Sequence, residues 1–559
     1  MFSLAAAQKA LFAQCDSYVA LQQADGAIHR ADWGLDDPGA TCSLVALCLY
    51  TGCHLDAAAH ALDYLEAYQR PSGLTDLRDC NFDSSPDAGF ILQAMCPAFL
   101  VSLLPSPGYP LDANPAEAGL AEGAPTSPTL APSSQGWEEG GGGRRVEAFL
   151  RRMVAGTLTG GFHTPNHRWV MSAGLALAEK CFPDLSEQIR PVIESYLAEG
   201  FDLNADSAWI ERSAGVYDAI CAKSLLILAE CGYERETCLE AVRRNLELNL
   251  QLFHADGTIE TGLSRRQDQG TRAVPSSLIV PLLWAGTLVN EPRFLQAAAF
   301  LQEKSPCDGY SLTQFLRQYG EPGAMEPRLP DDYTAHYPVL QAHRIRRGER
   351  SITAFGGTTR LLHLVSGQAE LVSVKISQAY FGVGRFVGDS MGEEAGAVVL
   401  RSEGKLSPYR PGYELPLGRP VPPEKYQELR AERALRRVAD CTSELEIKEL
   451  EDGSGISLRY VTRDGLDRVP AQLALDFAVG GVWETDDTAL QPQAGQVIFL
   501  KSGVGRMRYG RDMIEVSPGA SAHQMWAMRD SEPAPGLVRV LLTFLTPVEA
   551  CVTLRTTSI

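Results

Sequence analysis

The sequence predicts an α+β multidomain protein, in which an N-terminal (α/α) incomplete toroid at 1–345 precedes a C-terminal antiparallel β-sandwich at 346–559. Three observations support this prediction. The chain has 559 residues, more than a single hydrophobic core usually serves. Its apolar residues recur at helical spacing up to about residue 345 and alternate in short runs after it. Gly, Pro and Asp turns separate the segments in both halves.

The first half consists of Ala- and Leu-rich helical segments with short connections. Such connections favour antiparallel helix pairs, and stacked pairs close into a toroid. An amphipathic helix is expected at the N-terminus, and the later ones at 41–50, 55–69, 89–104, 168–181, 187–198, 216–231, 235–252, 275–290 and 293–304. The run 105–145 interrupts the pattern. It is rich in Pro, Gly, Ala, Ser and Glu, so we expect a disordered insertion between two helices.

The second half consists of short, β-branched, alternating segments that predict strands. They include 351–355, 359–367, 369–377, 396–403, 454–464, 471–480, 495–503 and 536–546. Regular short strands between turns are typical of a sandwich. A charged excursion at 421–439 is predicted to be helical.

Composition excludes some classes of function. The formal net charge is −19, which argues against nucleic acid as a partner because phosphate binding needs a basic surface. No stretch has the length and apolarity of a transmembrane helix, so no membrane partner is expected. The 13 cysteines form no CxxC pair and several lie among apolar residues, as in a reducing compartment. With no recognisable export signal, the expected location is the cytoplasm.

The first cluster of candidate functional residues lies where a glycine-bearing run enters a helix. It reads Thr-Pro-Asn-His-Arg-Trp at 164–169 and offers Asn166, His167, Arg168 and Trp169. A helix-capping asparagine followed by an incidental histidine is the simpler interpretation. An Asn-His-Arg triplet followed by tryptophan at the start of a helix favours a functional interpretation.

The second cluster, at 209–218, contains Glu211, Arg212 and Tyr217. Glu211 and Arg212 are equally consistent with a surface ion pair, which contributes little to stability. Tyr217 is equally consistent with a core tyrosine, but it opens an apolar helix, where its hydroxyl can face a cavity.

Three further clusters complete the candidate set. Residues 331–337 include Tyr333 and His336, and suit either a cleft wall at a domain junction or a packed linker. The turn at 80–87 includes Asn81 and Asp87, and suits either an Asx-rich helix cap or a polar rim for sugar hydroxyls.

The last cluster, at 264–268, includes Arg265 and Arg266 and concentrates cationic and amide donors suited to a carboxylate. The alternative interpretation of this run is the solvent-exposed edge of a helix.

No phosphate-binding loop, dinucleotide fingerprint, HExxH motif or nucleophile elbow is present. The spacing of the ten histidines shows no metal site. We therefore expect no cofactor, while a structural divalent metal in the β-rich domain, assembled in three dimensions, stays open.

Asn, His, Arg and Tyr together suit removal of the C5 proton of a uronic acid with loss of the substituent on C4. The carboxylate must first be neutralised by hydrogen-bond donors. A tyrosinate beside cations can take the proton, and the same phenol can return it to the leaving oxygen. If the two groups lie on opposite faces of the sugar, a second acid is needed, and His336 is the candidate.

The order TPNHRW, then ERSAGVY, then a histidine before a β-rich domain resembles the heparinase II/III-like polysaccharide lyases and related alginate and chondroitin lyases. The resemblance covers the chain in architecture and rests on short motifs. It implies that Asn166 and His167 grip the uronate carboxylate, that Tyr217 is base and acid, and that His336 assists. His343 and His363 are alternatives to His336.

By the same resemblance Arg168 or Arg212 supplies additional charge. The chain departs from the family in its missing export signal and in the insertion at 105–145. The expected substrate is therefore a uronate-containing oligosaccharide or glycoside rather than a large polymer, and the expected assembly a homodimer.

Two other classes of function stay open. A glycoside hydrolase on an (α/α) toroid would use paired carboxylates, for example Asp87 and Glu211. A non-catalytic sugar-binding protein could keep the same fold without turnover.

Overall fold

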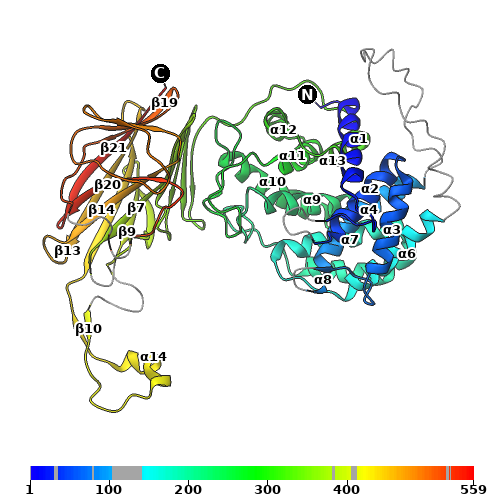
Figure 1. Ribbon diagram of the computed structural model, residues 1–559, viewed down its shortest axis with the longest axis horizontal. Coiled ribbons are helices and arrows are strands. Elements are labelled where there is room, and N and C mark those ends of the chain that lie inside the picture. Colours follow the sequence, from blue (N-terminus) through cyan, green and yellow to red (C-terminus); the bar gives the residue numbers. More distant parts are fainter. Residues whose placement is uncertain are drawn as a thin grey trace. The chain divides into compact units, whose positions relative to one another are not determined.

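The structure is a computed structural model that describes residues 2–29, 35–77, 81–103, 141–380, 384–404, 412–523, 528 and 531–558. The chain divides into two compact units. One comprises Met1–Leu250 and Gly257–Leu329, and the other Gln251–Asp256 and Pro330–Ile559. The first unit is helical and the second consists of β-sheets (Figure 1). The predicted fold class is confirmed.

The helices of the first unit lie mostly where the periodicity predicts them. They are α1 (Leu4–Leu21), α2 (Pro38–Thr51), α3 (Leu55–Tyr68), α4 (Ser85–Ser102), α6 (Gly142–Thr159), α7 (Pro165–Cys181), α8 (Ser186–Ala198), α9 (Tyr217–Glu230), α10 (Arg235–Leu252), α11 (Ile279–Leu288), α12 (Pro292–Lys304) and α13 (Gly309–Tyr319). Gly142–Arg145, in the predicted insertion, form the first turn of α6, and 104–140 lie outside the described residues.

Seven helices form a ring. In order, α1, α2, α4, α7, α9 and α11 each pack on the next, and α13 packs on both α11 and α1. Helices α3, α8 and α12 pack on the ring helices that precede them in the chain, which are α2, α7 and α11. The C-terminal halves of α4 and α7 meet where Cys181 Sγ lies 3.5 Å from the carbonyl oxygen of Cys96, and the C-terminal ends of α7 and α9 meet where Lys180 donates to the carbonyl oxygen of Glu230 at 3.3 Å. These three ring helices therefore run in the same direction, and their N-termini lie at one end of the ring.

Helices α4 and α7 approach each other closely because both carry a glycine at the contact. A Cβ added to Gly89 would lie 3.0 Å from the Cα of Met171, and one added to Gly174 would lie 2.8 Å from the carbonyl oxygen of Gly89. Gln93 on α4 also donates to the carbonyl of Val170 (3.1 Å) and to Ser224 Oγ on α9 (3.1 Å). These contacts set the spacing of the helix starts that carry the candidate site.

The second unit contains two large sheets. One has the strand order β17-β20-β14-β7-β6-β5-β4-β3 and the other β16-β15-β18-β19-β21-β13-β12-β9-β8. All neighbouring strands in them are antiparallel except β17 and β20. Two-stranded ladders join β1 (Asp76–Leu77) to β2 (Phe82–Asp83) in the first unit and β10 (Gly412–Glu414) to β11 (Leu435–Arg437) in the second.

The strands of the first large sheet are β3 (Asp332–Tyr337), β4 (Ala342–Arg347), β5 (Arg350–Phe355), β6 (Leu362–Ser366), β7 (Ala369–Gln378), β14 (Pro470–Phe477), β17 (Val497–Phe499) and β20 (Val538–Leu545). Those of the second are β8 (Ser390–Glu394), β9 (Ala397–Ser402), β12 (Cys441–Glu449), β13 (Gly455–Asp464), β15 (Val482–Glu484), β16 (Ala489–Leu490), β18 (Gly505–Tyr509), β19 (Asp512–Ser517) and β21 (Glu549–Ser558).

The charged excursion predicted as a helix forms only short turns, α14 (Tyr426–Leu429) between η3 (Pro423–Lys425) and η4 (Arg430–Glu432), before β11. Its residues bury little apolar area that could support a longer helix.

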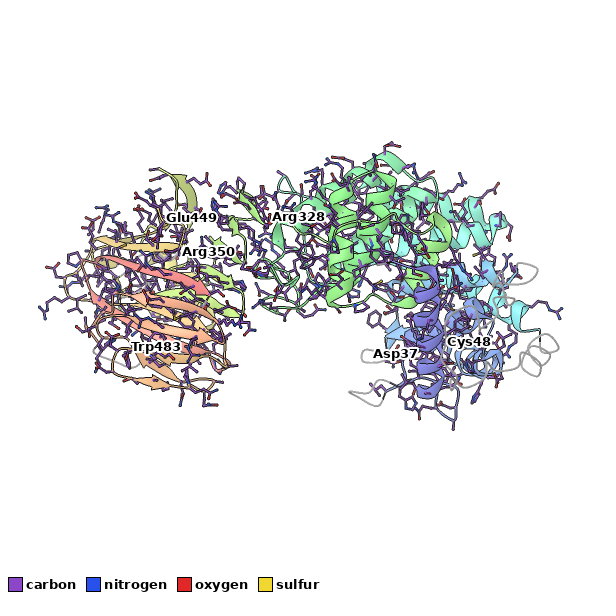
Figure 2. The ribbon with its side chains drawn as sticks, turned by 90° about the horizontal axis from the view of Figure 1, so that it is seen from above. Asp37, Cys48, Arg328, Arg350, Glu449 and Trp483 are labelled. Carbon is purple, nitrogen blue, oxygen red and sulfur yellow. The ribbon has the colours of Figure 1, made fainter. Side chains whose placement is uncertain are left out.

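One apolar core joins the two large sheets. It includes Ile352 and Leu473 from one sheet, Leu458 and Ile514 from the other, and the buried Trp483. Trp483 lies on β15 within the sheets (Figure 2). The alternation of apolar residues predicted for the strands places one face of each sheet in this core.

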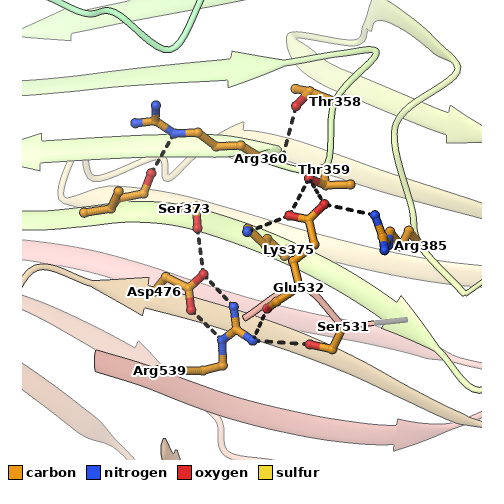
Figure 3. A network of polar contacts seen from close by, with 11 residues as sticks. Thr358, Thr359, Arg360, Ser373, Lys375, Arg385, Asp476, Ser531, Glu532 and Arg539 are labelled. Carbon is orange, nitrogen blue, oxygen red and sulfur yellow. Dashed lines mark hydrogen bonds and ion pairs between the residues drawn. The ribbon is translucent and has the colours of Figure 1, made fainter. Parts of the chain in front are cut away.

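A polar network crosses three strands of the first large sheet (Figure 3). Asp476 on β14 is fully buried and accepts from Arg539 on β20 through both carboxylate oxygens, at 2.6 and 2.9 Å. Ser373 on β7 donates to the same carboxylate at 2.9 Å. Glu532 continues the network to Lys375 at 2.8 Å. The network satisfies charges that would otherwise be costly to bury.

The segment Gln251–Asp256 follows α10 in sequence but belongs to the β unit. The reason is Arg344, whose buried guanidinium donates to the carbonyl oxygens of Gln251 (3.1 Å), Leu252 (3.1 Å) and Phe253 (2.9 Å). The Tyr333 hydroxyl donates to the Gln251 carbonyl at 2.5 Å.

The cysteines of the described residues are all free thiols, as their scattered positions predict. None of the helices in the described part of the chain has the length and apolarity that a membrane span requires.

Candidate active site

Two of the polar clusters singled out in the sequence meet a third at one end of the helical ring. Residues 164–167 enter α7, residues 209–217 enter α9, and the loop at 262–272 lies against both. The meeting point contains Asn166, His167, Glu211, Tyr217 and Arg266. We call these five residues the Tyr217 cluster.

Asn166 and Glu211 form the buried part of the Tyr217 cluster. The Asn166 side-chain amide donates to Glu211 Oε2 at 2.7 Å and its backbone N–H donates to the same oxygen at 3.3 Å. Arg266 Nη1 lies 3.4 Å from the other carboxylate oxygen. Glu211 is 6% exposed and Asn166 is fully buried. An amide and a guanidinium thus already hold a carboxylate at this position.

Tyr217 is the first residue of α9, and its phenol oxygen receives two hydrogen bonds. Arg266 Nη2 donates at 3.2 Å and Gln267 Nε2 donates at 2.6 Å. The Arg266 guanidinium also lies 4.6 Å from the centre of the Tyr217 ring. The hydrogen bond from Arg266 to Tyr217 is the main reason that the pKa of Arg266 is raised. A phenolate at this position would have a positive partner and an amide donor on its oxygen.

Two side chains fix the position of Tyr217. Ser213 Oγ accepts from the Tyr217 backbone N–H at 3.2 Å and thereby satisfies the first N–H of α9. Asp268 accepts from Ser264 Oγ (2.5 Å) and from the Gly215 N–H (3.2 Å), which joins the loop at 262–272 to the turn before α9. A Cβ added at Gly215 would lie 2.9 Å from Asp268 Oδ2, so a side chain there would displace this carboxylate.

His167 lies in the first turn of α7 beside a second histidine, His163, with ring centres 4.7 Å apart. Burial, and then the charges of His163 and Arg266, lower the pKa of His167 to about 4. His167 is therefore neutral near pH 7, with one ring N–H to donate. Its Nδ1 makes no hydrogen bond with the described residues.

Arg212 and Arg265 add positive charge next to the Tyr217 cluster. Burial and the charge of Arg265 lower the pKa of Arg212. Arg212 has a left-handed backbone (φ 54°), and the Arg265 N–H donates to the carbonyl of Glu211 at 3.0 Å. Two neighbouring cations of this kind suit an anionic ligand.

Arg168 and Trp169 are oriented into the scaffold. Arg168 pairs with Glu199 (2.9 Å) and Asp202 (2.8 Å), and the Trp169 indole N–H donates to Asp202 at 3.1 Å. Trp169 is fully buried. We therefore leave both residues out of the site proposed below.

Asn81 and Asp87 lie at the start of α4. Asn81 Oδ1 accepts from Arg70 at 3.0 Å. Asp87 accepts from Ser84, the N-cap of α4, and burial is the main cause that raises the pKa of Asp87. This geometry matches the helix-cap interpretation of the turn at 80–87.

A cavity of about 420 Å³ lies beside the same helix starts. Its lining includes Asp83 and His163, and the half-exposed rings of Phe82 (44% exposed) and Phe162 (40%). Exposed aromatic rings beside polar side chains are suited to a sugar ring, whose apolar face packs on an aromatic ring.

Tyr333 and His336 belong to the β unit, on the edge strand β3. The Tyr333 hydroxyl is bonded to the Gln251 carbonyl. His336 lies opposite His343 on β4. The assignment of His336 as a second acid stays a prediction of the sequence.

Sequence reasoning did not select Ser213, Gln267, Asp268 or His163 as site residues. Gln267 and Asp268 stand in the run 264–268 that was noted for its donors, so their position was visible but not their roles. Ser213 and Asp268 act through backbone contacts across the loop, which leave no signal in the spacing of side chains.

Groups of side chains able to hold a metal ion occur elsewhere in the described part of the chain. Within single units they are Asp25, His29 and Asp36 in the first and His336, His343 and Glu393 in the second. Neither includes a residue of the Tyr217 cluster.

No protein-family model matches the chain, and no curated protein is similar to it in sequence. Solved structures share its fold. A heparinase III superimposes with a TM-score of 0.55 at 10% identity, over 97% of this chain and 83% of its own. A Paenibacillus xanthan lyase superimposes with a TM-score of 0.54 at 10% identity, over 99% of this chain and 57% of its own. The chain therefore has the fold of polysaccharide lyases, as the resemblance of its motifs suggested.

Proposed function

We propose that the chain is a carbon–oxygen lyase that cleaves the bond at C4 of a uronic acid by β-elimination and leaves a 4,5-unsaturated uronate. The observation that carries the proposal is the Tyr217 phenol oxygen. It receives hydrogen bonds from Arg266 and Gln267 next to an amide, a neutral histidine and two further arginines. The fold shared with a heparinase III and a xanthan lyase supports it.

The first requirement of the reaction is to neutralise the substrate carboxylate. The C5 proton is weakly acidic while that carboxylate is charged, and hydrogen bonds from positioned donors lower the barrier. His167 has a ring N–H and Arg212 a guanidinium for this purpose. Glu211 holds Asn166 and Arg266 in place, so we assign it a positioning role.

The second requirement is a base at C5. Tyr217 as phenolate takes the C5 proton, the C–H electron pair forms the C4–C5 double bond, and the C4–oxygen bond breaks. The phenol then returns the proton to the leaving oxygen when both groups lie on one face of the ring. His336 remains the candidate acid for the opposite face.

The hydrolase alternative needs a protonated carboxyl near a second carboxylate. Glu211 is 6% exposed, and its two carboxylate oxygens lie against Asn166 and Arg266. It is thus engaged within the protein rather than open to a glycosidic oxygen, and this favours elimination.

The test uses the full-length chain with heparan, chondroitin, alginate and glucuronan oligosaccharides. We expect ultraviolet absorbance from the conjugated product with at least one of them. The Tyr217→Phe variant should lose about 10²- to 10⁴-fold in rate, the usual contribution of a general acid–base group, while Tyr18→Phe on α1 keeps the wild-type rate.

Two results would contradict this proposal. Release of reducing sugar from neutral glycans with no absorbance from any uronate would indicate a hydrolase. A Tyr217→Phe variant with the full rate would remove Tyr217 from the mechanism.

A further inference from the structure

A second cavity lies inside the helical unit, away from the Tyr217 cluster. Its volume is about 280 Å³, and its lining runs from the middle to the C-terminal ends of α4, α7 and α9, together with residues of α11 and α13. Lys223 and Glu230, which both line it, follow Tyr217 on α9. Because an α-helix rises about 1.5 Å per residue, they lie about 9 Å and about 20 Å along α9 from Tyr217. The cavity thus lies towards the opposite end of the ring.

The walls of this cavity are largely apolar. Leu177, Ile227 and Val280 contribute aliphatic groups, and Phe315 and Trp284 contribute aromatic rings. Ile227, Val280 and Phe315 are buried, so the cavity extends from the surface of the ring to its core. Walls of this kind suit the apolar body of a small ligand.

Lys223 places a positive charge on the wall. It is half-buried, and its Nζ donates to Ser311 Oγ at 3.5 Å, the longest distance at which a hydrogen bond forms. Among the residues that the structure describes, no carboxylate forms an ion pair with it. An ammonium group that is partly removed from water and lacks an opposite charge favours an anionic ligand.

Glu230 is the only acidic residue among the described residues that line the cavity, and other donors already occupy it. One carboxylate oxygen accepts from Trp284 Nε1 at 3.2 Å, and the other accepts from Gln318 Nε2 at 2.7 Å. Lys180 donates to the backbone carbonyl of Glu230 at 3.3 Å. The carboxylate therefore has neutral partners and does not serve as the counter-ion of Lys223.

Gln314 adds a further donor beside Lys223. It follows Ser311 by one turn on α13, so the two side chains are neighbours on the surface of that helix, and both line the cavity. The buried Nε2 of Gln314 makes no hydrogen bond of good geometry within the described part of the chain. A buried donor without an acceptor is costly, and an anionic oxygen bound at Lys223 relieves that cost.

We propose that this cavity binds a small carboxylic acid with an apolar body, such as an aryl-substituted propionate. Lys223, Ser311 and Gln314 donate to the carboxylate, and the body packs between Ile227 and Phe315. The volume is near the lower end of small-molecule sites, which limits the ligand to about ten to twelve non-hydrogen atoms. The apolar walls offer few partners for the hydroxyl groups of a sugar. This inference does not depend on the lyase proposal.

The test is isothermal titration calorimetry of the full-length chain with 3-phenylpropionate. We expect one molecule to bind per chain. The uncharged 3-phenylpropanamide, which has nearly the same shape, should bind at least tenfold more weakly because it cannot form charge-assisted hydrogen bonds. Lys223→Met keeps the aliphatic part of the side chain and removes the ammonium group. It should weaken binding of the acid at least tenfold and leave binding of the amide unchanged.

Leu177→Trp tests the place of the apolar body. Leu177 is partly exposed on α7 and lines the cavity, so a larger side chain there fills the cavity without replacing a core residue. Both the acid and the amide should bind at least tenfold more weakly to this variant. Wild-type affinity of Leu177→Trp for the acid would show that the ligand is bound elsewhere.

Two controls complete the test. Lys9→Met removes an exposed lysine of α1 and should bind the acid as the wild type does. Arg212→Met separates the cavity from the Tyr217 cluster, where cations are also available to a carboxylate, and should keep the wild-type affinity. The proposal is overturned if 3-phenylpropionate does not bind, if the amide binds as tightly, or if Arg212→Met rather than Lys223→Met loses the binding.

Discussion

At the scale of single residues, Glu211 contacts side chains that are distant in the sequence rather than its neighbour Arg212. Next to Arg212 it is compatible with a surface ion pair, yet in the structure it is 6% exposed. Its carboxylate binds the amide of Asn166, 45 residues away, and lies 3.4 Å from Arg266. Arg212 is left beside Arg265 instead. The carboxylate thus organises the donors of the Tyr217 cluster.

Asp218, the residue after Tyr217, makes stability depend on pH. It is 2% exposed and accepts from Asn245 and Asn249, both at 3.1 Å. Burial raises its pKa from 3.8 to about 6. Because the folded pKa lies above the unfolded one, the charged form costs stability, and the cost appears as the pH rises from 4 through 6.

We therefore expect Asp218→Asn to stabilise the helical unit by about 2–3 kcal/mol at pH 8 and to have little effect at pH 3. The measurement is urea unfolding across this pH range. The control is Asp56→Asn in the first turn of α3, where the carboxylate is exposed. Equal stability of wild type and Asp218→Asn at pH 8 would contradict the assignment.

At the scale of elements, the direction of the ring helices accounts for the Tyr217 cluster. Helices α7 and α9 run the same way, as the contact between their C-terminal ends shows, and α8 returns the chain between them. Asn166, His167 and Tyr217 each lie in the first turn of their helix. The alternation of ring and outer helices thus brings residues about 50 positions apart to one end of the unit.

The strands β7, β14 and β20 provide a test of the β unit at the same scale. Arg539→Ala removes the guanidinium from the buried Asp476 carboxylate and should cost about 3–5 kcal/mol, the usual effect of leaving one charge of a buried pair. Unfolding of the β unit, followed by calorimetry, measures it.

Replacing both charges, as Asp476→Leu with Arg539→Met, should restore most of the loss because no charge is then left buried. The half-buried pair of Arg508 and Glu484 at the sheet surface supplies the control, and Arg508→Ala should cost no more than about 1 kcal/mol. A cost for Arg539→Ala no larger than this control would show that the network does not stabilise the sheet.

At the scale of the whole molecule, the two units are not two consecutive pieces of chain. The β unit includes Gln251–Asp256, whose carbonyl oxygens accept from the buried Arg344. A fragment of residues 330–559 keeps Arg344 but loses these acceptors. Thr353, which accepts from Arg344 at 2.6 Å, is among the acceptors that the fragment retains.

We expect this fragment to unfold at a lower temperature than the β unit of the full-length chain. Arg344→Met should destabilise the full-length chain more than the fragment, because only the full-length chain has the three carbonyl acceptors that Arg344 binds. Thermal unfolding of the four proteins is the measurement. An equal loss of stability in both backgrounds would show that the segment does not contribute to the β unit through Arg344.

The sequence alone was sufficient for the succession of helices and strands, for the fold class and for the polar segments that contain Asn166, His167 and Tyr217. Periodicity and turn residues are local properties, and they determine local structure and which faces are buried. The same local signals placed β5, β6, β7, β13, β14, β17 and β20 in the chain.

Only the tertiary structure decided what those polar side chains contact. It placed Glu211 on Asn166, Gln267 and Arg266 on Tyr217, and Arg168 and Trp169 on Asp202. It also placed Glu393 beside His343, from strands in opposite sheets. These partners are far apart in sequence, and their meeting depends on helix direction, strand register and the approach of two sheets. None of these three follows from the spacing of residues along the chain.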